Sequence, residues 1–286
     1  MHPPVALLLH PAARLAVTDF TVHPSTVIGV AALGALYHWR ARQHPAGTHT
    51  PTPAQRANFF GALALILFSL NGWLHDLSDG YLFSAHMVQH LVLTLVAPPM
   101  LVMGTPGWML RPALEWRGVG AVARWLTAPS HCFLIFNVVL VAWHLPPMYE
   151  YAMAHHPIHI VQHLCFMTAA VLMWWPVLSP LPELPRLSYP GQMLYLFLLS
   201  IPMSLVAVCI GYADHVLYPF YSSAPRIMGI TPMQDQMIGS LIMWIPGGLF
   251  FFVIISVVFF RWQQRAGDED SQAGAQVDWR RADGVL

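Results

Sequence analysis

The stretch FSAHMVQHLVLTLVAPPMLVMGTP (residues 83–106) decides the fold of this chain. It holds no charged residue and, as a helix, is long enough to cross a hydrocarbon core of roughly 30 Å. Backbone groups in lipid must be hydrogen-bonded internally, which favours a helix over an open strand. The stretch therefore predicts a membrane-spanning helix that carries two histidines, His86 and His90, near its start.

The composition of the whole chain points the same way. Of its 286 residues, 56% are hydrophobic and only 9% are charged, whereas a soluble domain has about 25% charged residues. Its three cysteines are scattered singly without a CxxC pair, so neither a disulfide framework nor a thiolate zinc site is predicted. These features predict a polytopic membrane protein of the all-α class.

About seven segments have the length and apolar content of transmembrane helices. We expect them near residues 22–40, 57–74, 84–104, 124–145, 157–177, 190–212 and 236–262. The chain thus divides into an N-terminal outer segment (1–21), a seven-helix transmembrane domain (22–262) and a cytoplasmic tail (263–286). The polar composition of the tail predicts disorder.

The arginines predict the orientation. All 13 basic residues are arginine, and only Arg14 and Arg226 fall on the side opposite to the other eleven. Because cytoplasmic loops carry the excess of positive charge, we expect the N-terminus outside and the C-terminus in the cytoplasm.

With this orientation, most histidines near the membrane fall on the outer side. The candidate metal ligands of that side are His75, His86, His90, His144, His159, His163 and Asp235. By contrast, the cytoplasmic side receives His38, His44, His49 and His131. Ionisable residues in membrane helices are expensive to bury and are functional candidates for that reason.

Two nearly identical hexapeptides, HMVQHL from His86 and HIVQHL from His159, supply two pairs of histidines. Residues four apart on a helix share a face. His86 with His90 and His159 with His163 therefore form two double-imidazole faces, and a helix pair that brought them together would present four imidazoles to one site. The alternative for any single histidine is a hydrogen bond to a neighbouring helix.

Several chemistries can be compared on these residues. The hexapeptides lack the glutamate of the HExxH zinc-protease motif, so a membrane metalloprotease is not expected. Haem b would use one histidine from each helix and leave the other over. Imidazole suits copper in either oxidation state, and zinc fits a nitrogen-rich site too. The outer-side methionines are expected to pack rather than to bind metal.

Three blocks of the sequence resemble the multi-spanning CtaG family of cytochrome c oxidase assembly factors. They are residues 83–106, the stretch AWHLPPMYEYAMAHHPIHIVQHLCFMTAAVLMWWPVL (142–178) and DQMIGSLIMWIPGG (235–248). The resemblance extends over about residues 55–262. It implies a factor of the bacterial cytoplasmic (inner) membrane that helps haem–copper oxidase to mature.

The resemblance also gives the expected function. We expect a copper-binding chaperone, without enzymatic activity, that passes copper to cytochrome c oxidase subunits, with copper ion and membrane lipid as its other partners and no nucleic-acid partner. The paired histidines would be ligands, His144 a fifth or an exit ligand, and Asp235 the group that orients an imidazole. His75 would lie where the metal enters. A haem-b redox protein and a metal-free scaffold for an oxidase subunit remain alternatives.

Overall fold

The structure is a computed structural model that describes residues 21–282, with side chains described for residues 21–268. Within these residues every regular element is a helix, which confirms the all-α class. The elements are α1 (Pro24–Arg42), α2 (Pro53–Ser69), α3 (Gly72–Gly80), α4 (Phe83–Leu91), the π-helical turn η2 (Val92–Val96), α5 (Ala97–Gly104), α6 (Gly107–Leu114), α7 (Val119–Leu126), α8 (Pro129–His144), α9 (Pro146–Ala154), α10 (His156–Leu178), α11 (Tyr189–Gly211), α12 (Pro219–Ser222) and α13 (Pro232–Ala282). The predicted outer segment 1–21 lies outside the described residues, apart from Thr21.

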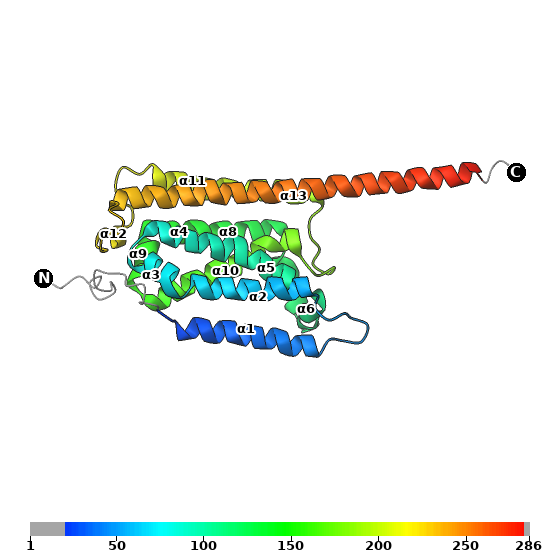
Figure 1. Ribbon diagram of the computed structural model, residues 1–286, viewed down its shortest axis with the longest axis horizontal. Helices are drawn as coiled ribbons and strands as arrows, with labels where there is room; N and C mark the ends of the chain where they lie inside the picture. Colours follow the sequence, from blue (N-terminus) through cyan, green and yellow to red (C-terminus); the bar gives the residue numbers. More distant parts are fainter. Residues whose placement is uncertain (1–20, 283–286) are drawn as a thin grey trace.

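The long helices form a bundle with α1 along one side and α13 along the opposite side (Figure 1). The short helices α3, α9 and α12 gather at one end of the bundle, and α6 lies at the other end. Both the α4–α5 segment and α10 run inside the bundle, between α1 and α13. The apolar window of the α4–α5 segment is 61% buried and that of α10 is 50% buried.

Within the described residues, four helical segments have the length and apolar composition of membrane spans. They are Phe83–Gly104, α10, α11 and the Pro232–Asp268 part of α13. Two bent pairs raise the number to six if each counts as one span: α2 with α3, bent by 44°, and α7 with α8, bent by 70°. The predicted count of seven is not confirmed, because α1 is not among these candidates. Its last two turns carry His38, Arg40 and Arg42, which make it less apolar than the others.

The span that contains the first histidine pair is irregular at its centre. Pro98 has no N–H, so the carbonyl oxygen of Thr94 loses its normal helical partner, and the backbone widens into η2. The indole Nε1 of Trp174 on α10 donates to that oxygen at 3.0 Å. Trp174 is 1% exposed, so a buried hydrogen bond joins the α4–α5 segment to α10 where the helix is weakest.

α13 packs closely against both α4 and α11. A Cβ at Gly239 would collide with the ring of Phe83 on α4, so only glycine permits this approach. On the other side, the hydroxyl of Ser240 donates to Ala207 O at 2.8 Å and Gln236 Nε2 donates to Ile210 O at 3.1 Å. α13 is therefore held in register with α4 and α11.

The C-terminal part of the chain differs from the expectation. Residues 263–286 were predicted to be disordered, yet the backbone of α13 is helical through Ala282 and projects beyond the bundle (Figure 1). Helix propagation costs far less than nucleation, so a helix started in the apolar segment continues into polar sequence. Residues 283–286 lie outside the described residues.

The two ends of the bundle differ in charge. At the α6 end, Arg40 donates to Met109 O at 3.4 Å, and Arg111 pairs with Glu183 at 2.7 Å. The predicted outer-side histidines lie at the opposite end, with α3 and α9. This separation is what the arginine pattern predicted, while the direction of the bundle across a membrane stays a prediction.

Candidate metal centre

The two histidine pairs face each other across α4 and α10. Within each helix the ring centroids are close, at 4.3 Å for His86 and His90 and 4.4 Å for His159 and His163. Between the helices, His86 lies 5.5 Å from His159, and His90 lies 5.4 Å from His163. The hexapeptide repeat thus supplies both halves of one cluster of four imidazoles.

These imidazoles are buried and mostly without hydrogen bonds. Exposure is 0% for His86, 6% for His90, 4% for His159 and 5% for His163. Both ring nitrogens of His86, His90 and His163 lack a partner, as does Nε2 of His159. A buried polar atom left unpaired costs about 1–3 kcal/mol. Seven unpaired nitrogens in one cluster therefore favour a bound ligand over a purely structural role.

Asp79, on α3, completes the cluster from the side. One of its carboxylate oxygens, Oδ2, lies 3.1 Å from Nδ1 of His159, and Oδ1 lies 4.0 Å from Nδ1 of His86. One ligand atom from each of these three residues lies within 4.8 Å of the other two. Asp79 is not among the ligands predicted from the sequence. Its position four residues after His75 was the signal that it shares a helix face with a candidate ligand.

His75 lies at the edge of this cluster. Its Nε2 is 3.4 Å from Oδ2 of Asp79, and its Nδ1 is 3.3 Å from Nε2 of Gln89. Gln89 Nε2 also donates to Ser69 O at 2.6 Å. Gln89 therefore bonds the backbone of a neighbouring helix and also contacts His75. Gln162, the matching residue of α10, is fully buried without a hydrogen-bond partner.

His144, at the end of α8, lies on the opposite side of the cluster from His75. Its ring centroid is 6.1 Å from that of His90. Nδ1 bonds Leu140 O at 2.7 Å, while Nε2 is buried and unpaired. The structure thus brings His144 next to His90 of the histidine cluster.

Asp235 has a different contact from the one predicted. Its two carboxylate oxygens accept the backbone N–H groups of Phe83 at 2.7 Å and Ser84 at 3.0 Å. These are the first residues of α4, where N–H groups lack helical partners and where the helix dipole favours a negative charge. Asp235 therefore contacts the backbone of α4, which carries His86 and His90, and not an imidazole.

Three tyrosines close the end of the bundle over the cluster. The hydroxyl of Tyr221 donates to Ser78 O at 2.8 Å, and the hydroxyl of Tyr149 lies 2.8 Å from that of Tyr221. Tyr218 donates to His144 O at 2.9 Å. Burial raises the pKa of both the Tyr149 and the Tyr221 hydroxyl, so both stay protonated and able to donate.

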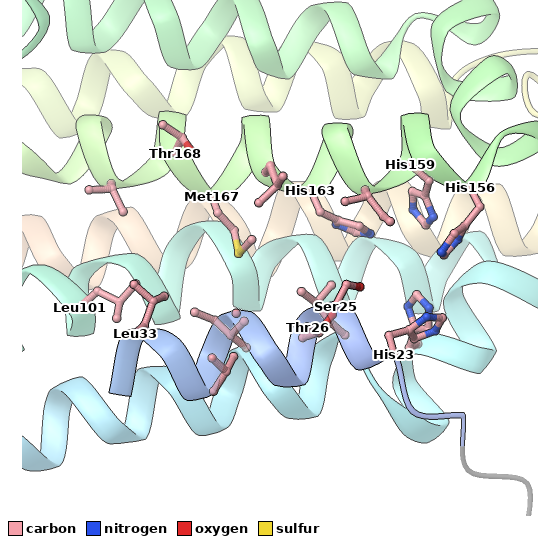
Figure 2. Close-up of a pocket in the computed structure, with 18 residues that line it drawn as sticks. His23, Ser25, Thr26, Leu33, Leu101, His156, His159, His163, Met167 and Thr168 are labelled. Carbon is pink, nitrogen blue, oxygen red and sulfur yellow. The ribbon is translucent and has the colours of Figure 1, made fainter. Parts of the chain in front are cut away.

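A groove of about 390 Å³ leads from the side of the bundle to the cluster. It lies between α1 and α10, and its wall is mainly apolar (Figure 2). His23, His156, His159 and His163 lie toward one end of it (Figure 2). His23 connects this end to His75, with ring centroids 4.3 Å apart. The groove gives His159 and His163 a route to the outside that the sequence did not reveal.

The donor atoms restrict the chemistry. The cluster offers imidazole nitrogens and one carboxylate, a donor set that suits copper and zinc. The imidazoles also pack against aromatic rings. The ring centroids are 5.3 Å apart for His86 and Tyr149 and 4.6 Å apart for His90 and Phe166. A porphyrin between the two helices would need the space that these ring contacts fill.

Comparison with known proteins bears on the function. The family model described as cytochrome c oxidase caa3 assembly factor (Caa3_CtaG) matches residues 31–265, which confirms the resemblance. "Uncharacterized protein Mb0105" of Mycobacterium bovis is 23% identical over 221 residues, 72% of this chain and 33% of the relative. "Uncharacterized protein ML1998" of Mycobacterium leprae is 23% identical over 242 residues, 78% of this chain and 36% of the relative. The chain spans about a third of the length of these relatives. No solved structure matches.

Proposed function

Because the chain belongs to the cytochrome c oxidase caa3 assembly factor family, we propose that it binds copper at the histidine cluster and passes it to an oxidase subunit. The family sets the general role, which is assembly of the oxidase. Copper as the cargo is our inference from the residues. The recipient is an oxidase subunit in the same membrane, and the bacterial cytoplasmic membrane is the location that this role requires.

One observation carries the proposal: four buried imidazoles, with seven ring nitrogens unpaired, lie against a carboxylate. Without a ligand such an arrangement is costly. A bound cation would pair with Asp79 and take these ring nitrogens as ligands. The seven nitrogens have no hydrogen bond that the cation would have to displace. Metal ligation therefore accounts for features that helix packing leaves unexplained.

The charge distribution supports a delivery side. With the arginine-rich end in the cytoplasm, the cluster opens to the outer face, where the groove beside α1 and α10 gives access from the lipid side. Asp79, whose side chain is 23% exposed, lies between solvent and the buried nitrogens. Copper would meet Asp79 and His75 before it reaches His86 and His159.

The test is a Cu(I) competition titration against a colorimetric chelator with detergent-purified protein. The variant changes His86, His90, His159 and His163 to alanine. The matched control changes the same number of histidines at the other end of the bundle, His38, His44, His49 and His131. We expect tight copper binding in the wild type and the control, and loss of it in the cluster variant.

The two alternatives give different results in the same preparations. Haem b would give a red protein with a sharp Soret band that the cluster variant loses. A metal-free scaffold would bind no stoichiometric copper in any of the three proteins. Copper retained by the cluster variant would contradict the proposal outright.

Delivery requires a second measurement. A bacterial strain that lacks its own gene for this factor would be complemented with the gene for the wild type, the cluster variant or the control. Membranes would then be prepared from each strain. We expect oxidase copper content and oxygen consumption to return with the wild type and the control only. Full recovery with the cluster variant would separate the assembly role from the histidines.

A further inference from the structure

We propose that His90, His144 and the sulfurs of core methionines form a second, deeper site that binds Cu(I) in preference to divalent ions. The proposal rests on the proposed copper function and extends it to two successive positions. The outer position is the Asp79, His86 and His159 group. The inner one lies where α4, α8, α10, α11 and α13 meet.

A cavity of about 20 Å³ marks the inner position. This is enough for a single water-sized occupant. Its wall includes His90 from α4 and His144 from α8, together with three methionines from three helices, Met87, Met203 and Met243. Residues from distant parts of the chain therefore present five potential donor side chains to one small space.

The imidazoles that line this cavity have nitrogens available for a metal. His90 is 6% exposed and has no hydrogen bond at either ring nitrogen. In His144 the carbonyl of Leu140 accepts a hydrogen bond from Nδ1, which requires the proton on Nδ1 and leaves a lone pair on the unpaired Nε2. A backbone carbonyl that fixes the tautomer in this way is the usual support of a metal-binding histidine.

The three methionines distinguish this position from the outer one. They are 1%, 3% and 3% exposed in the order Met87, Met203 and Met243. A single buried methionine is ordinarily a packing residue. Here three methionine side chains line one cavity with His90 and with His144, whose Nε2 is unpaired, and thioether sulfur is a soft ligand that selects Cu(I).

Charge also favours the monovalent ion. Among the described residues that line the cavity, none is acidic, so no anion there compensates a second positive charge. Burial of an uncompensated charge is costly, and the cost is larger for a divalent ion. The outer position has the carboxylate of Asp79, so zinc and Cu(II) can bind there but are disfavoured at the inner one.

The two positions are adjacent. His90 lies one helical turn below His86, with ring centroids 4.3 Å apart. A copper ion at the outer group can therefore move inward by exchanging one imidazole for the next. Such a step changes ligands without a change of oxidation state, provided that the ion is already Cu(I).

The experiment combines Cu(I) stoichiometry with X-ray absorption spectroscopy on the detergent-purified full chain. The inner variant changes Met87, Met203 and Met243 to leucine, which nearly conserves volume. The outer variant changes His86 and His159 to alanine. The control changes three exposed methionines, Met103, Met148 and Met237, to leucine.

We expect two Cu(I) per wild-type chain, one of them with sulfur in its coordination shell. The inner variant should bind half as much Cu(I), lose the sulfur signal and keep its Zn(II) binding. The outer variant should keep the sulfur-bound Cu(I) and lose Zn(II). The control should match the wild type.

Copper without a sulfur shell in the wild type would overturn the inner site and leave the proposed function standing. A sulfur shell that persists in the inner variant would overturn it too. Absence of copper from the wild type would overturn both. Should the triple leucine variant fail to fold, selenomethionine-labelled wild type decides the matter, because the inner site requires a copper–selenium signal.

Discussion

The two ends of the bundle use charge in opposite ways. At the α6 end the ionised groups are exposed, as in the pair formed by Arg111 and Glu183, whose side chains are 47% and 44% exposed. At the histidine end the groups that build the candidate site are buried: Asp235 is 0% exposed and the ring of His86 is 0% exposed. Exposed pairs contribute little to stability, whereas buried groups must have partners. The histidine end is therefore the part of the protein in which single changes should have large effects.

The largest effect should follow Asp235→Asn. Two backbone N–H groups of α4 donate to this carboxylate, and an amide offers only one oxygen. Bonds to charged groups contribute about 1.5–3 kcal/mol each, so we expect a loss of about 2–3 kcal/mol in unfolding free energy. The measurement is thermal unfolding in detergent, followed by Cu(I) titration of the folded fraction.

The control for this change is Asp214→Asn, at an exposed position of the same bundle end. It should leave the unfolding temperature unchanged. Equal effects from the two substitutions would show that burial and the two backbone contacts of Asp235 do not matter.

The next effect concerns the metal. Asp79→Asn removes the carboxylate beside His86 and His159, and we expect copper affinity to fall about 10–100-fold, the range typical for loss of a supporting ligand partner. The control is Asp76→Asn on the same helix; Oδ2 of Asp76 accepts from Thr21 N at 3.3 Å. If both variants bound copper like the wild type, Asp79 would have no part in the site.

A smaller effect is expected in the middle of the bundle. Trp174→Phe leaves the carbonyl of Thr94 without the indole donor, which should cost about 1–2 kcal/mol of unfolding free energy. Trp175→Phe is the matched control, because its indole nitrogen is buried without a partner. If both variants unfolded at the same temperature, the indole of Trp174 would not stabilise the π-helical turn.

The smallest effects are pH-dependent and have opposite signs at the two ends. Burial raises the pKa of the Glu150 carboxyl, although the N–H of Phe220 partly offsets this. In Glu183, the backbone and then Arg111 lower the pKa by hydrogen bonding. Glu150 therefore contributes stability at acid pH that is lost as pH rises through its folded pKa, and Glu183 contributes stability above its unfolded pKa that is lost as pH falls.

The measurement compares Glu150→Gln and Glu183→Gln with the wild type by unfolding temperature between about pH 4 and 7. As pH rises, the wild type should lose stability relative to Glu150→Gln and gain stability relative to Glu183→Gln. Differences of the same sign at both positions would contradict the contrast between the half-buried carboxylate of Glu150 and the exposed carboxylate of Glu183.

Much of the architecture followed from patterns within single segments. Apolar runs without charge predicted helices, and the spacing of four placed His86 with His90 and His159 with His163 on common faces. The bends did not follow, because hydropathy carries no information on the direction of a helix axis. The predicted segments 57–74 and 124–145 cross the 44° and 70° breaks. Disorder was predicted from residue 263, yet α13 continues to Ala282. Composition does not indicate whether a helix that has already formed continues into polar sequence.

The sequence by itself determined that this is an all-helical membrane protein of an oxidase assembly family, with two matching pairs of histidines. Only the tertiary structure decided that the pairs meet, that Asp79 joins them and that Asp235 holds the start of α4, 151 and 152 residues away in the chain. It also decided that Met87, Met203 and Met243 share a cavity with His90 and His144. The physical reason is that periodicity reports which residues share a face of one helix, while a binding site depends on which faces pack together.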